Sequence, residues 1–250
     1  MYLIIDNGNS FLKTSVYDQL GNEIAFYEIK NDAISLSFFQ EIFDHHKITK
    51  CYIGSVAPNL MNNVINLIKG ISDCQIIIIK AKDFCDELDL SKFNLNELGV
   101  DILAYSLFLK KTYTKAIGIC FGTALFAIGV SNSVLHGAII LPQIESGLKQ
   151  LEQNTELIKI DWKEMNNKNA YLDFGYNTPT ALISGINHAY NGIIMSICNY
   201  FYQTLKLNTL CITGGNSGKL LFDQNNVKQT KVYWVKNAVI KGYAFLIFNK

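Results

Sequence analysis

A hairpin-like segment occurs twice in this chain. The sequence IIDNGNSFLKTSVYD, which starts at Ile4, aligns without gaps with GICFGTALFAIGVSN, which starts at Gly118. In each copy, an apolar strand leads through a glycine turn with small residues into a second apolar strand, which is the pattern of a β-hairpin. The repeat therefore predicts a fold built by duplication of one hairpin-led unit. The alignment pairs Asp6 with Cys120, Gly8 with Gly122, Asn9 with Thr123, Ser10 with Ala124 and Val16 with Val130.

A second pair of segments follows in the same order. CYIGSVAPNL, from Cys51, and LCITGGNSGKLL, from Leu210, each combine an apolar strand, small residues and the expected start of a helix. The two correspondences predict an N-terminal half, residues 1–112, and a C-terminal half, residues 113–250, with a ligand-binding crevice between them. Because the paired segments lie further apart in the second half, an insertion is expected there, between about Val134 and Thr178.

Strands and helices alternate around these landmarks, which indicates an α/β fold. The clearest helix should begin with Thr178 as its N-cap and Pro179 at its first position. It should run toward Leu205, with a break near Gly185 or Gly192. The other expected elements are a buried strand at Cys74–Ala81 and helices at Asp32–His46, Asn59–Gly70 and Leu98–Lys111.

The composition limits the classes of partner. Charged residues make up 17% of the 250 residues, the formal net charge is +1, and the 22 basic residues are all lysine. This balance gives no electrostatic footprint for nucleic acid or a membrane surface, and the chain lacks arginine, the residue that most often reads guanine. The six cysteines show no CxxC pair and no metal-ligand spacing, which favours a reduced, cytoplasmic location.

The segment Asp6-Asn7-Gly8-Asn9-Ser10 has the clearest chemistry. Asp6 ends a buried strand and should point into the crevice, where its carboxylate can hold Mg²⁺ beside the phosphates of a nucleotide. Gly8 lets the backbone approach a phosphate closely. An ordinary hairpin with an Asx turn would carry similar residues. The copy at Cys120–Ala124 favours phosphate binding, because two hairpins that wrap phosphates resemble the acetate/sugar-kinase and actin superfamily.

A second glycine-rich segment, Thr213-Gly214-Gly215-Asn216-Ser217, lies between a predicted strand and a predicted helix. Its two glycines would allow the base and sugar of a nucleotide to come close to the backbone. As a plain strand-to-helix turn, with Ser217 near the N-cap, the same segment would be purely structural.

Seven short motifs occur in an order that resembles the type III pantothenate kinases, from near residue 1 to near residue 245. They are DNGNS (6–10), GSVAP (54–58), ELGVD (97–101), FGTA (121–124), HGAIILP (136–142), NTPTALISG (177–185) and TGG (213–215). The resemblance implies an α/β fold of duplicated actin-like (ribonuclease H-like) domains with a central crevice, and a homodimer. It also implies ATP-dependent phosphorylation of pantothenate to 4'-phosphopantothenate, the first step of coenzyme A biosynthesis.

The same resemblance assigns roles to individual residues. Asp101 matches the catalytic aspartate, which accepts the proton of the substrate hydroxyl and must lie within hydrogen-bond reach of it. The alternative for Asp101 is a carboxylate that stabilises the first turn of a helix. Thr178 matches a threonine that reaches pantothenate from the other subunit. Asp6 is assigned to Mg²⁺ and, with Gly8, Asn9, Ser10, Lys13, Gly122, Thr123, Gly214 and Gly215, to the nucleotide, whereas Gly99, Val100 and Ile102 are assigned to the substrate.

The chain departs from the family at some of these positions. Ile102 stands where the family has an arginine that contacts substrate; Lys110 and Lys111 are candidate replacements, but lysine lacks the planar guanidinium fork. Cys120 stands where the family usually has an aspartate associated with a monovalent-cation site, and a thiol should bind K⁺ or NH₄⁺ poorly. Further differences lie at Phe126, Ala127, His136 and Gln143.

The sequence is compatible with three functions. The leading hypothesis is a divergent pantothenate kinase, because Asp6, Asn9 and Asp101 are retained. A second is a non-catalytic relative that binds nucleotide or regulates, since Ile102 and Cys120 replace functional residues and some family members are described as accessory factors for gene expression. A third is a kinase for another small alcohol, because arginine is the residue best suited to a substrate carboxylate.

Overall fold

The computed structural model describes residues 1–160, 174–215, 217, 222–227 and 229–248. The chain divides into two compact units. The first unit contains Met1–Thr114, Asn132–Leu135 and Asn237–Lys250, and the second contains Lys115–Ser131 and His136–Lys236. None of the helices described is both long enough and apolar enough to cross a membrane. The six cysteines, all of them among the described residues, form no disulfide.

The first unit is built on a five-stranded sheet with the order β3-β2-β1-β4-β5. β1 pairs antiparallel with β2, and β2 with β3, whereas β1 pairs parallel with β4, and β4 with β5. The strands are β1 (Tyr2–Asn7), β2 (Phe11–Tyr17), β3 (Glu23–Lys30), β4 (Lys50–Ser55) and β5 (Gln75–Ile78). β5 is shorter and less buried than the strand predicted at Cys74–Ala81, because it lies at the edge of the sheet.

The sheet of the second unit repeats this topology. Its order is β10-β9-β6-β7-β8, with β6 and β7 antiparallel and with β9 parallel to both β6 and β10. The strands are β6 (Lys115–Phe121), β7 (Ala124–Ser131), β8 (Val134–Pro142), β9 (Thr209–Thr213) and β10 (Lys231–Trp234). The hairpins and the downstream strands that match in sequence, β4 and β9, thus occupy equivalent places in the two sheets. The predicted duplication and the α/β fold class are confirmed.

The two hairpin turns differ in length by one residue. The backbone N–H of Gly8 donates to the carbonyl of Phe11 at 3.2 Å, whereas that of Gly122 donates to the carbonyl of Ala124 at 3.1 Å. One residue fewer is enclosed in the second turn, so residues after the turn are offset by one between the two copies. The ungapped alignment therefore holds up to the turn and is wrong beyond it, at the pairs Ser10–Ala124 and Val16–Val130.

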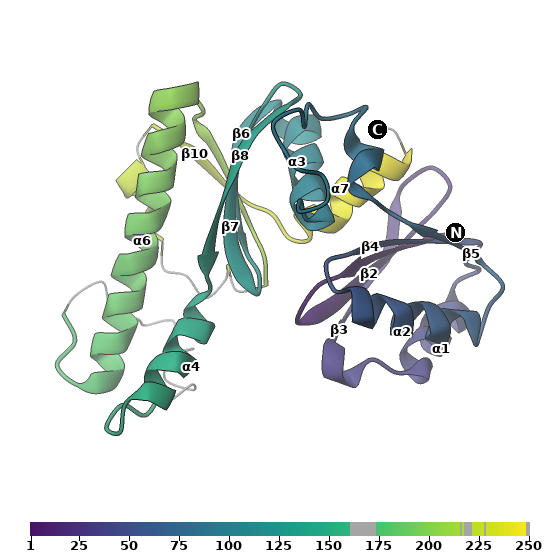
Figure 1. Ribbon diagram of the computed structural model, residues 1–250, viewed down its shortest axis with the longest axis horizontal. Helices are drawn as coiled ribbons and strands as arrows, with labels where there is room; N and C mark the ends of the chain where they lie inside the picture. Colours follow the sequence, from purple (N-terminus) through teal and green to yellow (C-terminus); the bar gives the residue numbers. More distant parts are fainter. Residues whose placement is uncertain (161–173, 216, 218–221, 228, 249–250) are drawn as a thin grey trace. The chain divides into compact units, whose positions relative to one another are not determined.

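Helices cover both faces of the first sheet (Figure 1). α1 (Leu36–His45) and α2 (Pro58–Lys69) bury Phe39, Ile42, Val64 and Ile68 against Leu3 and Ile5 on one face. α3 (Val100–Tyr113) and α7 (Ala238–Phe248) lie on the other face, which carries Tyr2, Ile4 and Asp6. The helix expected from Asp32 starts later, because residues Asn31–Ala33 form a 3₁₀ turn and Ser35 is the N-cap of α1. A second 3₁₀ turn, η2, covers Ala81–Phe84.

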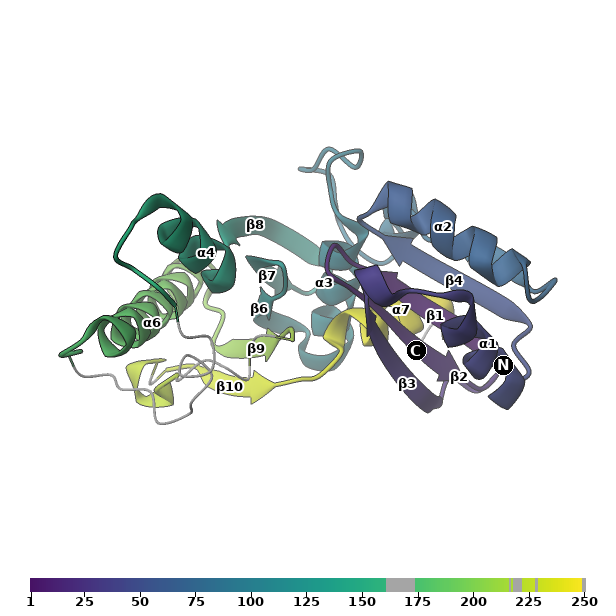
Figure 2. The ribbon, with the colours of Figure 1, turned by 90° about the horizontal axis from the view of Figure 1, so that it is seen from below.

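In the second unit, α6 (Thr178–Leu205) packs along the sheet (Figure 2). It is continuous over 28 residues, so the predicted break near Gly185 or Gly192 is absent. Its N-cap is Asn177 rather than Thr178, because the Asn177 side chain accepts a hydrogen bond from the Thr180 N–H at 3.0 Å. The other helical elements described here are α4 (Ile144–Asn154) and the 3₁₀ turn η4 (Gln224–Val227).

The connection between β8 and β9, residues 143–208, is much longer than that between β3 and β4, residues 31–49. The insertion therefore follows β8, which belongs to the repeated sheet, and lies within the predicted range between about Val134 and Thr178. Residues 161–173 of this insertion lie outside the described residues.

The last helix, α7, belongs to the first unit, although the sequence-based division placed it in the second half. Its sequence, AVIKGYAFLIF, is almost entirely apolar and packs extensively on α3. The ring centroids of Phe245 and Phe108 are 6.1 Å apart, and those of Phe248 and Tyr2 are 5.7 Å apart. A Cβ on Gly242 would overlap the backbone of Ala104, so α7 and α3 touch backbone to backbone at this position.

Replacing Gly242 by alanine should lower the free energy of unfolding by about 3 kcal/mol, because the added methyl group would push α7 off α3. The matched control is Gly185→Ala, an exposed helical position in α6 with open space around it. That change should raise stability, by about 1 kcal/mol, through helix propensity. Urea denaturation of both variants checks the two signs, and a Gly242→Ala protein as stable as wild type would contradict the close packing.

Candidate active site

Asp6 lies near the carboxyl end of β1, between two strands. Its register partners are Lys13 on the antiparallel strand β2 and Gly54 on the parallel strand β4. Paired residues point to the same face of a sheet, so the Asp6 carboxylate and the Lys13 ammonium share the face covered by α3 and α7. The Lys13 Nζ also lies 3.6 Å from the Glu28 Oε2 on β3. The structure thus brings together two of the residues predicted to bind phosphate.

Asp101 lies in the first turn of α3, where Gly99 is the N-cap. Its Oδ1 accepts a hydrogen bond from the Ile102 N–H at 2.9 Å. A Cβ on Gly99 would stand only 2.5 Å from this Oδ1 and 3.5 Å from the Val56 Cγ1. Gly99 therefore matters because any side chain there would displace the carboxylate. A carboxylate in the first turn of a helix can also serve only to stabilise the helix. The surroundings of Asp101 distinguish this structural role from a catalytic one.

Those surroundings raise the pKa of both aspartates. The pKa of Asp6 is raised from 3.8 to about 7, mainly by burial and in addition by the nearby Asp101 carboxylate, while Lys13 opposes the change. Burial also raises the pKa of Asp101, against the hydrogen bond from Ile102. The two carboxylates thus interact across a poorly solvated space in which a negative pair is unfavourable.

This pair fits Mg²⁺ bound together with a nucleotide. Mg²⁺ is usually held by one or two carboxylates, with water and phosphate oxygens completing its shell. Within the residues that the structure describes, no group of three or more His, Cys, Asp or Glu side chains could cage a metal ion without such help. Asp6 supplies a carboxylate in a space where a cation would relieve the repulsion from Asp101.

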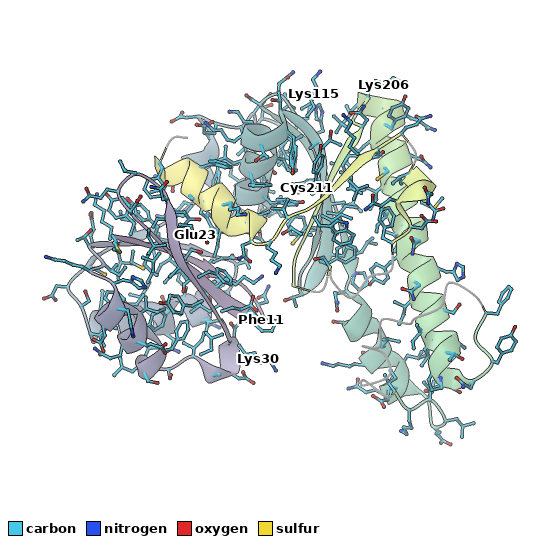
Figure 3. The ribbon with its side chains drawn as sticks, turned by 180° about the vertical axis from the view of Figure 1, so that it is seen from behind. Phe11, Glu23, Lys30, Lys115, Lys206 and Cys211 are labelled. Atoms are coloured by element: carbon cyan, nitrogen blue, oxygen red, sulfur yellow. The ribbon has the colours of Figure 1, made fainter. Side chains whose placement is uncertain are left out.

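The first hairpin turn exposes Asn9 and Ser10, and Gly8 lies tight against Phe11, whose carbonyl would be 3.2 Å from a Cβ at Gly8. Asn31 holds this turn from outside. Its side-chain amide donates to the Gly8 carbonyl at 2.9 Å, and its backbone N–H donates to the Ser10 carbonyl at 3.1 Å. Figure 3 shows the end of the sheet concerned, where Phe11 and Lys30 are register partners. Asn31 was not among the residues predicted from the sequence, where an asparagine directly after a strand was the only signal for it.

The second hairpin differs in the chemistry of its strands. Thr123 is exposed at the turn, and Gly122 has room for a Cβ, which would be 3.5 Å from the Ala124 carbonyl oxygen. Cys120 is buried and pairs across the strands with Phe126, where the first hairpin has Asp6 and Lys13. Its register partner on the other side is Thr213 on β9. Cys120 thus offers a thiol where the first hairpin has a carboxylate, and a thiol is a poor ligand for a hard cation.

The two glycines after β9 have different roles. Gly214 has a φ of +104°, and a Cβ there would overlap the backbone of Phe121, so only glycine fits. Gly215 is exposed, with nothing within 4 Å of a Cβ, which leaves its backbone open to a ligand. The Ser217 hydroxyl donates to the Gly214 carbonyl at 2.7 Å. Asn216 lies outside the described residues, and Cys211 marks β9 in Figure 3.

The remaining predicted substrate residues do not supply a cation. Val100 and Ile102 are each 8% exposed and belong to the core around α3. Lys110 and Lys111 both bind Glu87, at 2.7 and 3.2 Å, and are more than two helical turns away from Asp101. The suggestion that they replace the missing arginine is therefore wrong. Thr178 is exposed in the first turn of α6, in the second unit.

The chain matches the family model described as "Type III pantothenate kinase" over residues 2–200. It is similar to a type III pantothenate kinase from Malacoplasma penetrans (strain HF-2), with 27% identity over 257 residues that cover 98% of this chain and 96% of that protein.

Solved structures share the fold. A conserved Baf-family transcriptional activator from Campylobacter jejuni superposes with a TM-score of 0.62 at 20% identity, covering 99% of this chain and 98% of that one. A ROK-family glucokinase from Streptomyces griseus, in complex with glucose and AMPPNP, has a TM-score of 0.55 at 11% identity, covering 98% of both chains.

The raised pKa of Asp6 should be visible directly. In carbon NMR, its carboxyl should titrate at about 7; Lys13→Met should raise this midpoint, and Asp101→Asn should lower it. Because the folded-state pKa lies above the unfolded value, the contribution of Asp6 to stability should be lost as the pH rises from about 4 through about 7. Wild type should therefore lose stability over this range relative to Asp6→Asn. An Asp6 midpoint near 4 would contradict the burial of the carboxylate pair.

Proposed function

This chain belongs to the type III pantothenate kinase family, and we propose that Asp6 and Asp101 carry its reaction, the transfer of a phosphoryl group from ATP to the hydroxyl of pantothenate. The observation that carries the proposal is the meeting of these two carboxylates, from β1 and α3, in one poorly solvated space. Phosphoryl transfer depends mainly on positioning and charge neutralisation, so a small set of acidic and backbone groups suffices.

Asp101 acts as the base in this proposal. A carboxylate whose pKa is raised toward neutral binds a proton more readily, which suits a group that accepts the hydroxyl proton of the substrate. Gly99 leaves space for that carboxylate at the helix N-terminus. Asp6 holds Mg²⁺, which when bound neutralises the charge on the phosphates of ATP. Gly8, Asn9, Ser10 and Lys13 approach the same phosphates from the first hairpin.

The family resemblance also assigns the second hairpin and the turn after β9 to the nucleotide. Gly122 and Thr123 approach the phosphates, and Gly215 approaches the base and sugar, since its backbone is open. Gly214 contributes to nucleotide binding indirectly, because its positive φ sets the conformation of this turn. By resemblance, the protein works as a homodimer in the cytoplasm, and Thr178 reaches the partner's substrate; its exposure at the start of α6 supports this role.

The site around Ile102 favours a second candidate function. Ile102 is buried, and the lysines on the same helix are bound to Glu87, so α3 offers no cation for the carboxylate of pantothenate. This observation supports a kinase for a small alcohol that lacks a carboxylate. A screen of hydroxyl compounds in an ADP-release assay separates the two candidates, because the alternative requires turnover of another alcohol and none of pantothenate.

Asp101→Asn should lower kcat for pantothenate about 10²- to 10⁴-fold, because the amide cannot accept the hydroxyl proton. The measurement is coupled ADP release with MgATP and pantothenate, with the product identified by mass. Asp86→Asn, which changes an exposed carboxylate near α3 in the sequence, is the matched control and should keep wild-type activity. Full activity of Asp101→Asn would remove Asp101 as the base.

Turnover should be independent of monovalent cations. Cys120 is buried and stands where the family usually has an aspartate, and a thiol is a poor ligand for a hard cation. Replacing K⁺ by Na⁺ at constant ionic strength should therefore leave kcat and KM unchanged. Strong activation by K⁺ or NH₄⁺ would show that another group supplies the cation site.

A further inference from the structure

Tyr243, on α7, is completely buried, and its hydroxyl has no hydrogen-bond partner among the described residues. A buried hydroxyl without a partner costs free energy, whereas a phenylalanine ring of the same shape would not. The site is otherwise well packed, with the Phe84 ring centroid 6.5 Å from that of Tyr243. The hydroxyl therefore has no structural task in the unliganded protein.

The hydroxyl lies beside the carboxylate pair, in the same unit of the chain. A Cβ on Gly54 would overlap both the ring and the hydroxyl of Tyr243. Gly54 is the parallel register partner of Asp6, so the phenol crosses β4 on the face to which the Asp6 side chain points. Gly54, conspicuous in the sequence only as part of GSVAP, leaves the space that lets the phenol reach this position.

The surroundings of the Tyr243 hydroxyl favour a protonated group that donates a hydrogen bond over an ionised phenolate. An ordinary phenol carries its proton at neutral pH, and burial disfavours the charged phenolate. The phenol therefore stays protonated and has a hydrogen to donate, in a place where two carboxylates are the nearby charges.

We propose that Tyr243 is a positioning residue whose hydroxyl donates a hydrogen bond to the Asp6 carboxylate when the magnesium–nucleotide complex is bound. This inference rests on the proposed function of Asp6. Once a cation draws the Asp6 carboxylate into one orientation, the hydroxyl beside it fixes that orientation from the side of α7. The terminal helix, which comes from the far end of the sequence, thereby takes part in nucleotide binding.

The test is Tyr243→Phe, which removes the hydroxyl and keeps the ring. Binding of MgADP, measured by calorimetry, should weaken about tenfold, while the melting temperature should stay equal or rise because an unpartnered buried group is gone. The control is Tyr27→Phe, also in the first unit, where the hydroxyl lies 3.0 Å from the His46 Nε2. That variant should melt lower and bind MgADP as tightly as wild type.

Three results would overturn the inference: unchanged MgADP binding by Tyr243→Phe, a clear drop in its melting temperature, or a loss of MgADP affinity in Tyr27→Phe equal to that in Tyr243→Phe. The proposed function fails separately, if wild type binds MgADP but does not turn over pantothenate; the binding comparison then still decides the role of Tyr243. If wild type binds no MgADP, both proposals fail.

Discussion

The burial of two carboxylates, Asp6 and Asp101, is the constraint on which the candidate site in the first unit depends. The two residues come from different elements, and burial raises the pKa of both. The Asp101 charge raises the pKa of Asp6 further, and Lys13 on the neighbouring strand lowers it. The hydrogen bond from the Ile102 N–H lowers the pKa of Asp101. Two glycines, Gly54 and Gly99, leave the space that the arrangement needs. A site with these properties is costly for stability and well suited to a cation and a phosphate.

Duplication has produced two sheets of the same topology with different chemistry at the equivalent hairpins. In the first, the cross-strand pair is Asp6 with Lys13, which places opposite charges on the face below α3 and α7. In the second, the corresponding pair is Cys120 with Phe126, which is apolar. The cross-strand pair of opposite charges thus occurs only at the first of these two hairpins, while the second has an exposed threonine at its turn, and the backbone at Gly215 after β9 is open.

The residues around α3 explain how a member of this family can lack arginine and still keep its fold. Ile102 is buried in the core. Lys110 and Lys111, in the last turn of α3, form salt bridges with Glu87. Nothing in the packing of α3 depends on a guanidinium group. An isoleucine at position 102 is thus compatible with the fold of α3 and with the position of Asp101 in its first turn.

The sequence by itself determined the duplicated hairpins, the downstream strands and the helices at their approximate places, because alternation of apolar residues and glycine turns are local signals. Its motifs also led to the predicted roles of Asp6, Asp101 and the glycines. Tertiary structure decided what local signals do not contain: the one-residue offset after the second turn, the N-cap at Asn177, and the return of α7 to the first unit. It also decided that Asn31 holds the first turn and that Tyr243 lies beside Asp6. These contacts join residues far apart in the chain, and only the packing of helices on the sheet brings them together.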